Sequence, residues 1–160
     1  MFFKYLLLDL DDTLYDYSYC HKKSIQLVFN ILSKCSNESL ETINEVYNLI
    51  NENLKKEIGT TASSHNKTIY FKHLIEKLNI DLSLLITCEK EYWDTFYSNM
   101  KCYDGVLEFI KWIKKRNIKI AIITDYETEY QIKKLKTLDM LEYIDVIVTR
   151  EEIGKEKPSS

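Results

Sequence analysis

Two acidic side chains near the N-terminus have the spacing of a metal-binding pair. Asp9 and Asp11 stand two residues apart, directly after the apolar residues 5–8. Neighbouring carboxylates repel each other unless a cation lies between them or one is protonated. Magnesium prefers oxygen ligands and commonly joins one or two carboxylates to a substrate phosphate. The pair therefore indicates magnesium-dependent phosphate chemistry; the alternative is a polar turn in which Asp and Thr side chains cap the chain.

Three short apolar runs could form the strands that position these side chains. They cover residues 4–9, 118–124 and 145–149, are rich in branched residues and end on polar groups. Such runs are typical of parallel strands that are buried on both faces. In an open parallel sheet, ligands bind beyond the carboxyl ends of the strands, which is where Asp9 and Thr124 would lie.

Helical patterns lie before and after the second run. Residues 104–116 show apolar side chains at helical spacing after Asp104, which is a suitable N-cap. Strands and helices in alternation predict an α/β fold with a doubly wound, Rossmann-like parallel sheet. Residues 127–138 predict a further helix. Its apolar side would be made by Ile132, Leu135 and Leu138, and its solvent side by Lys133, Lys134 and Lys136.

The stretch between the first strand and residue 100 is different in kind. Four amphipathic helices are predicted there, because apolar side chains recur every three to four residues. A polar loop at residues 59–66 separates the second helix from the third. We expect a helical subdomain, residues 17–100, inserted in one crossover of a core made by residues 1–16 and 101–160.

The residues around Asp9 and two later segments resemble those of a known family. Residues 8–15, Leu-Asp-Leu-Asp-Asp-Thr-Leu-Tyr, are similar to the D-x-D-x-T first motif of the haloacid dehalogenase-like hydrolase superfamily. Residues 122–125, Ile-Ile-Thr-Asp, resemble its second motif, a Thr or Ser at the end of the next strand. Residues 150–158, with a Lys directly before Pro158, resemble the third. By the order and spacing of these segments, the chain is identified as a member of this superfamily.

The resemblance implies a role for each matching residue. Asp9 would be the nucleophile that forms an aspartyl-phosphate, and Asp11 would act first as general acid and then as general base. The Asp9 carboxylate and the Asp11 backbone carbonyl would hold Mg²⁺. Thr124, Asp125 and Lys157 would contact the substrate phosphate. Taken alone, Thr124 could equally be a helix cap, and Lys157 a solvated surface charge.

Asp11 also separates two reactions within the resemblance. Members of the superfamily that attack carbon lack this second Asp, because halide leaves without a proton. Its presence favours a phosphatase acting on small phosphomonoesters, and residues 17–100 would then be a helical cap that selects the substrate. Tyr15, Tyr17 and Tyr19 could reach that substrate or pack within the cap.

The fourth motif of the superfamily, a pair of acids after a further strand, is not found in these 160 residues. Three strands are also fewer than the roughly five or six of most doubly wound sheets. We therefore expect an incomplete sheet, from a truncated gene or one part of a longer protein, with weak magnesium binding and little activity. A second interpretation stays open, which is a non-catalytic fragment that binds phosphate or a protein partner.

Composition argues against several other classes. The 22 basic and 25 acidic side chains give a formal net charge of -3 without a basic block, so nucleic acid and anionic membranes are not expected partners. No apolar run approaches the roughly 20 residues of a membrane span. The four cysteines lack C-x-x-C spacing, which favours free thiols in a reducing cytosol. We expect a cytoplasmic protein whose partner is a small phosphorylated metabolite.

Overall fold

The computed structural model describes residues 3–58 and 66–153, and the chain divides into two compact units. Unit 1 combines Met1–Tyr19 with Met100–Ser160, and unit 2 is Cys20–Asn99. The division into a catalytic core, residues 1–16 and 101–160, and a substrate-selecting cap, residues 17–100, stays a prediction. Within the described ranges, no helix is both long and apolar enough to cross a membrane.

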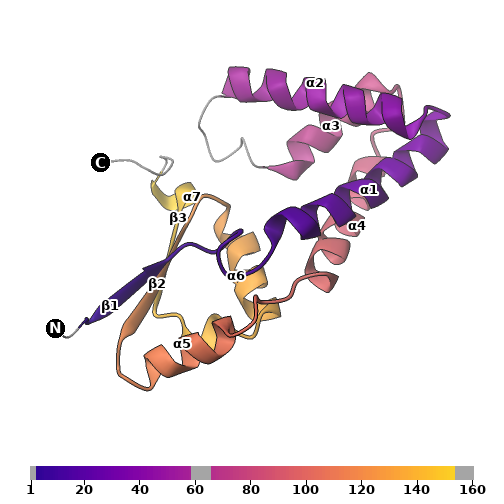
Figure 1. Cartoon of the computed structure of the whole chain (residues 1–160). Coiled ribbons are helices and arrows are strands. Elements are labelled where there is room, and N and C mark those ends of the chain that lie inside the picture. The colour runs from indigo at the N-terminus through magenta and orange to yellow at the C-terminus, as the bar shows by residue number, and fades with distance from the viewer. Residues whose placement is uncertain (1–2, 59–65, 154–160) are drawn as a thin grey trace. The chain divides into compact units, whose positions relative to one another are not determined.

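Unit 1 is built on a sheet of three parallel strands, β1 (Tyr5–Leu8), β2 (Lys119–Thr124) and β3 (Val146–Thr149), in the order β1-β2-β3 (Figure 1). Leu8 is paired with Ile122, so the first motif begins directly beside the end of β2. The predicted α/β class and the three predicted strands are confirmed. Because parallel strands end at one edge of a sheet, the polar groups that follow them are brought together.

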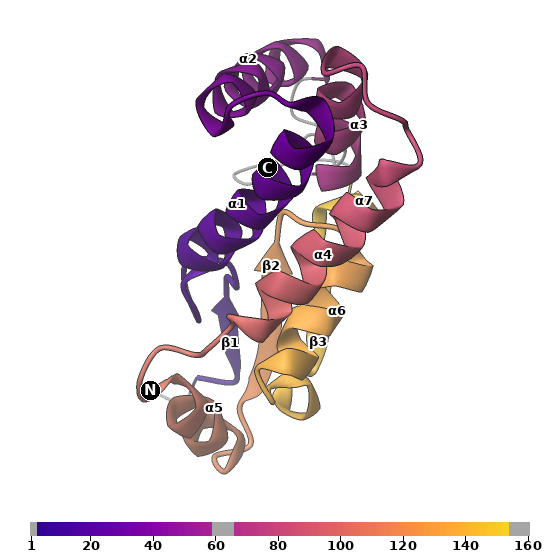
Figure 2. The same ribbon diagram turned by 90° about the vertical axis from the view of Figure 1, so that its right-hand side faces the viewer.

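The helices α5 and α6 lie on the same face of this sheet (Figures 1 and 2). Ile110 and Ile113 of α5 pack with Ile120 of β2, and Gln131 of α6 reaches Thr124, two pleats further along the same face. Each strand of the order β1-β2-β3 is added on the same side of the one before it. Because both crossovers are right-handed, their helices then lie on the same face. The bounds of the helical segments of unit 1 are α5 (Val106–Lys114), α6 (Thr128–Thr137), the 3₁₀ turn η2 (Leu141–Tyr143) and α7 (Arg150–Ile153).

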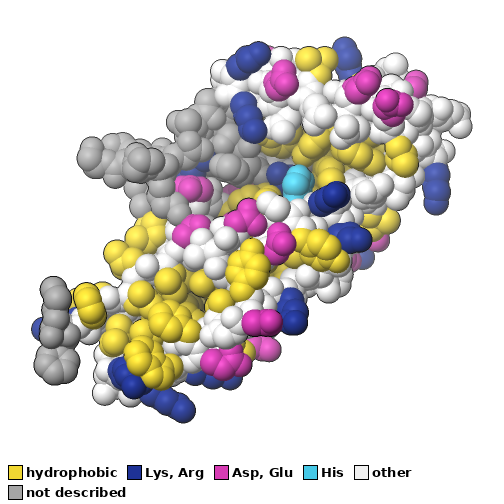
Figure 3. Space-filling view, in the orientation of Figure 1, with side chains coloured by type: hydrophobic (Ala, Val, Ile, Leu, Met, Phe, Trp, Pro, Cys, Tyr) yellow, Lys and Arg dark blue, Asp and Glu magenta, His cyan; other side chains and the backbone are white. Residues whose placement is uncertain are grey.

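The opposite face of the sheet carries exposed apolar side chains. Tyr5, Leu7 and Val146 are 70%, 63% and 53% exposed, whereas α5 and α6 of the same unit lie on the other face (Figures 1 and 2). In the view of Figure 3, hydrophobic side chains gather over the region of β1, β2 and α5. On α5 itself, Phe109 and Trp112 are also exposed, at 43% and 48%.

Two helix predictions were wrong in detail. The N-cap of α5 is Gly105 rather than Asp104, and its φ of 83° is a left-handed conformation that glycine adopts without strain. In α6, Lys134 was expected to face solvent but is fully buried, whereas Ile132 is 39% exposed. The buried face of α6 is therefore rotated from the apolar face that the sequence suggested, and it is directed at a polar partner.

Asp145 fastens the start of β3 to the rest of unit 1. Its carboxylate accepts hydrogen bonds from the Nζ atoms of Lys114 (2.7 Å) and Lys119 (2.8 Å) and from the backbone N–H of Ile120 (2.9 Å). These donors hold the pKa of the Asp145 carboxyl well below its usual range. The charge thus ties α5 and β2 to β3 at the end of the sheet opposite to Thr124.

Unit 2 consists mainly of the four predicted helices, α1 (Tyr17–Ser36), α2 (Leu40–Ile58), α3 (Lys67–Lys77) and α4 (Leu84–Ser98). Aromatic rings fill part of its interior: the Tyr92 ring centroid lies 5.5 Å from that of Phe71 and 5.1 Å from that of Trp93. The predicted polar loop lies outside the described residues except for Asn66, whose side chain accepts from the backbone N–H of Ile69 and caps α3.

Candidate active site

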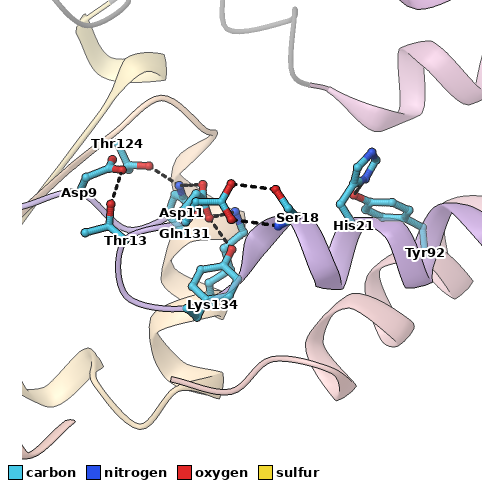
Figure 4. A network of polar contacts seen from close by, with 11 residues as sticks. Asp9, Asp11, Thr13, Ser18, His21, Tyr92, Thr124, Gln131 and Lys134 are labelled. Atoms are coloured by element: carbon cyan, nitrogen blue, oxygen red, sulfur yellow. Dashed lines mark hydrogen bonds and ion pairs between the residues drawn. The ribbon is translucent and has the colours of Figure 1, made fainter. Parts of the chain in front are cut away.

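The first motif forms a tight turn directly after β1. Leu10 is fully buried, and its carbonyl accepts the backbone N–H groups of Thr13 (3.3 Å) and Leu14 (3.0 Å). This turn brings the Thr13 hydroxyl within 3.0 Å of Asp9 Oδ2, to which it donates a hydrogen bond (Figure 4). The carboxylate proposed as nucleophile is therefore oriented by a side chain of its own motif.

The three acids of the motif have different partners. Asp12 has a φ of 55°, and its carboxylate accepts the backbone N–H and the hydroxyl of Ser18, each at 3.0 Å. It accepts a backbone N–H of the first turn of α1 from outside the helix, while Asp16, the residue before α1, accepts that of Tyr19 at 2.7 Å. Asp11 instead extends toward α6 (Figure 4). The adjacent residues Asp11 and Asp12 thus have different positions, one candidate catalytic and one structural.

Asp11 is held by three side chains. Lys134 Nζ lies 2.8 Å from Asp11 Oδ1, Gln131 Nε2 donates to Oδ2 at 2.9 Å, and the hydroxyl of Tyr15 donates to Oδ1. The Asp11 side chain is 22% exposed, whereas Lys134 and Gln131 are fully buried. Both carboxylate oxygens are therefore fixed while part of the side chain stays open to solvent.

Aromatic rings surround the ammonium group of Lys134. Its Nζ lies 4.3 Å from the ring centroid of Tyr126 and 5.1 Å from that of Tyr17. The negative face of an aromatic ring attracts a cation, and the attraction is stronger when water is excluded. Tyr15 and Tyr17, predicted to contact substrate or to pack in the cap, thus support the Asp11–Lys134 pair from within unit 1.

Thr124 lies at the end of β2 and is 3% exposed. Gln131 Nε2 donates to its Oγ1, so the Thr124 hydroxyl hydrogen can be directed to another acceptor. The alternative that Thr124 caps α6 is not supported, because the N-cap position is Glu127. Asp125 follows directly and is partly buried, and its contact with phosphate stays a prediction. Lys157 lies outside the described residues.

The described part of the third motif joins α6 to β3. Glu151 Oε2 accepts the backbone N–H of Thr128, and Glu152 Oε2 accepts that of Thr149, both at 3.0 Å. The hydroxyls of Thr128 and Thr149 are 2.7 Å apart. The acids of α7 thus have structural partners at the carboxyl end of the sheet.

The oxygen atoms of the first motif suit a magnesium ion in type. Asp9 offers a carboxylate and Asp11 a backbone carbonyl, and both are hard oxygen ligands. Magnesium takes about six such ligands, often including water and substrate phosphate. In the part of the chain that the structure describes, no group of three or more His, Cys, Asp or Glu side chains is arranged to hold a metal.

Sequence comparison agrees with this arrangement of motifs. A family model for haloacid dehalogenase-like hydrolases matches residues 6–160. The chain belongs to this family. One relative is the ribulose-1,5-bisphosphate 5-phosphatase of Halopiger xanaduensis, which is 29% identical over 97% of the chain and 66% of the relative. The glyceraldehyde 3-phosphate phosphatase of Methanopyrus kandleri is 26% identical over 98% of the chain and 65% of the relative.

Solved structures of haloacid dehalogenase-like proteins share the fold. The HAD phosphatase of Thermococcus onnurineus matches 98% of the chain and 66% of that protein, with a TM-score of 0.69 and 22% identity. The HAD-hydrolase YfnB of Bacillus subtilis, determined with bound magnesium, matches 99% of the chain and 70% of that protein, with a TM-score of 0.67 and 21% identity. The chain spans about two thirds of the length of these relatives.

Sequence reasoning missed Thr13, Gln131 and Lys134 as neighbours of the predicted acids. Thr13 belongs to the recognised motif, and only its side-chain contact was unforeseen. Gln131 and Lys134 are three residues apart, and with Leu135 and Leu138 they lie along one face of the helix. A search for helix faces that combine apolar and polar side chains would have identified Gln131 and Lys134 as candidates.

Proposed function

We propose that the chain carries the nucleophile and the acid–base group of a magnesium-dependent phosphatase that acts on small phosphomonoesters. The observation that carries the proposal is the position of Asp11. It is an acid two residues beyond Asp9, bonded through Gln131 to Thr124 at the end of the neighbouring strand. The names of the relatives, which are phosphatases, point the same way.

The proposed reaction has two steps. In the first, an Asp9 carboxylate oxygen attacks phosphorus, the bond from phosphorus to the ester oxygen breaks, and Asp11 gives that oxygen a proton. In the second, Asp11 takes a proton from a water molecule, which attacks the aspartyl-phosphate and releases inorganic phosphate and free Asp9. Thr124 would donate its hydroxyl hydrogen to a phosphoryl oxygen in both steps. Bound magnesium would offset the negative charge of phosphate and carboxylate.

Small sugar phosphates are the substrates that we would test first. Two relatives act, by their names, on ribulose-1,5-bisphosphate and glyceraldehyde 3-phosphate. The four cysteines are free thiols in the structure, which is compatible with the reducing cytoplasm where such metabolites occur. We do not expect nucleic acid or membrane partners.

The test is hydrolysis of p-nitrophenyl phosphate by the purified chain with magnesium and with excess chelator. We expect slow turnover, in line with the little activity expected of residues 1–160, that requires magnesium and is absent in Asp9→Asn, because a carboxamide cannot act as the nucleophile. Asp12→Asn is the matched control: it makes the same chemical change three residues along the chain, at a carboxylate bonded to Ser18. It should retain most of the activity.

Two outcomes would overturn the proposal. Turnover by Asp9→Asn, or turnover unaffected by the chelator, would show that Asp9 or magnesium lacks the role assigned here. Phosphate binding without turnover by the unaltered chain would favour the alternative of a non-catalytic phosphate-binding protein. Binding of inorganic phosphate can be measured by isothermal titration calorimetry on the same sample.

A further inference from the structure

A buried lysine faces the acid–base candidate from a segment outside the matched motifs. Lys134 of α6 is fully buried and lies 2.8 Å from Asp11. We propose that Lys134, with Gln131, is a positioning residue for catalysis: the pair holds the Asp11 carboxyl group where, in its protonated form, it can give a proton to the leaving oxygen. This inference rests on the proposed function, because it concerns a step of the same reaction.

Packing alone does not account for the contact between Lys134 and Asp11, because burying the ammonium group costs desolvation free energy. A fully buried ammonium loses its hydration, and only good geometry with a partner charge compensates for that loss. An apolar side chain of similar length would fill the same space without a desolvation cost. The charge is instead retained, directed at Asp11 and bordered by the rings of Tyr126 and Tyr17. The surroundings of Lys134 thus favour a single orientation of the Asp11 side chain.

Gln131 extends the same arrangement to the phosphate-binding candidate. Its Nε2 donates one hydrogen to Asp11 Oδ2 and the other to Thr124 Oγ1. An amide nitrogen has two hydrogens, so both donations are made at once. Because Gln131 and Lys134 are on one helix turn, α6 sets the position of the Asp11 carboxylate relative to the hydroxyl that would bind phosphate.

Proton donation to a leaving group is sensitive to such positioning. A poor leaving group, such as an alkoxide, needs a proton as the bond to phosphorus breaks, whereas p-nitrophenolate leaves well without one. A misplaced Asp11 should therefore slow hydrolysis of alkyl phosphates far more than that of aryl phosphates. A residue with only a structural role would lower both rates by the same factor.

The first experiment compares Lys134→Met with the unaltered chain on glycerol 3-phosphate and p-nitrophenyl phosphate. We expect kcat to fall about 100-fold on the alkyl ester and less than about 10-fold on the aryl ester, with KM nearly unchanged. Lys133→Met is the matched control, because Lys133 is the neighbouring residue of α6, is 51% exposed and pairs with Glu129 on the surface. Equal losses on the two esters would overturn the positioning role.

The second experiment needs no turnover. Urea unfolding of Asp11→Asn, Lys134→Met and the double variant measures the coupling of the two residues. Asp11→Asn should lower the unfolding midpoint, and adding Lys134→Met should recover part of that loss, because the buried charge is removed with its partner. Additive midpoint shifts would overturn the inference. Clear coupling in a chain whose phosphatase activity survives Asp9→Asn would instead overturn the proposed function, because Asp11 would then serve no step that Asp9 begins.

Discussion

The Asp9 carboxylate has a neighbour within its own motif, the hydroxyl of Thr13. The D-x-D-x-T spacing closes a turn in which residue i+4 returns to residue i, and the hydroxyl donates to Oδ2 at 3.0 Å. A hydrogen bond to an ionised group contributes more than one between neutral groups, and it restricts the carboxylate to one rotamer. The attacking oxygen would then approach phosphorus from a fixed direction.

Removal of the Thr13 hydroxyl is expected to impair the first step. Thr13→Val keeps the shape of the side chain but deletes the donor, and we expect phosphatase kcat to fall roughly tenfold, the size of a lost charged hydrogen bond. Thr13→Ser restores the donor and should recover most of the rate. Steady-state rates on p-nitrophenyl phosphate provide the measurement. If Val and Ser variants behave alike, the hydroxyl has no part in orienting Asp9.

At the scale of elements, the strands and helices were predictable and the orientation of α6 was not. Runs such as 118–124 are apolar because β2 is buried, so the local sequence is sufficient to predict the strand. The buried stripe of α6 contains Lys134, which the apolar pattern placed on the solvent side, and the polar residue Gln131. Their burial depends on Asp11, more than a hundred residues away in sequence, which no local pattern reports. The contact between Thr13 and Asp9 is local, but it needs the turn geometry.

In unit 2, a single histidine joins α1 to α4. His21 Nδ1 lies 2.8 Å from the hydroxyl of Tyr92, which is fully buried among the aromatic rings. Burial, with a smaller effect from the charge of Lys67, lowers the pKa of His21 from 6.5 to about 3. The folded unit therefore holds His21 neutral over a range in which the unfolded chain binds a proton there.

This difference in proton binding predicts an acid-sensitive helical unit. Because the unfolded state binds the extra proton, the free energy of unfolding falls as pH decreases from 6.5 toward about 3 and no further below that. We expect His21→Gln to remove roughly 2 kcal/mol of this loss between about pH 7 and pH 4.5. Thermal unfolding at a series of pH values measures it. His73→Gln, at a 43% exposed site on α3, serves as control; equal pH slopes in both variants would contradict the assignment to His21.

The uncovered face of the sheet matters at the scale of the whole molecule. Right-handed crossovers placed α5 and α6 together on one face, which leaves Tyr5, Leu7 and Val146 exposed on the other. β1 is also one of the two outer strands of the described sheet, the other being β3, so one of its edges has backbone groups without a described strand beside them. An apolar strand at an open edge is a template for pairing with another chain.

Polypeptide 1–160 is therefore expected to self-associate through this face. Leu7→Lys places a charge in the middle of β1, where another sheet would have to bury it, and should weaken association about tenfold, which is the effect of losing one buried leucine contact. Ile86→Lys is the matched control, since Ile86 is 71% exposed on α4 of the helical unit. Sedimentation velocity over a range of concentrations gives the dissociation constants. Equal weakening by the two substitutions would place the contact elsewhere, whereas a monomer at all concentrations would show that the exposed strand is tolerated. A selective effect of Leu7→Lys, reproduced by Val146→Lys on the same face, would identify the uncovered sheet as the associating surface.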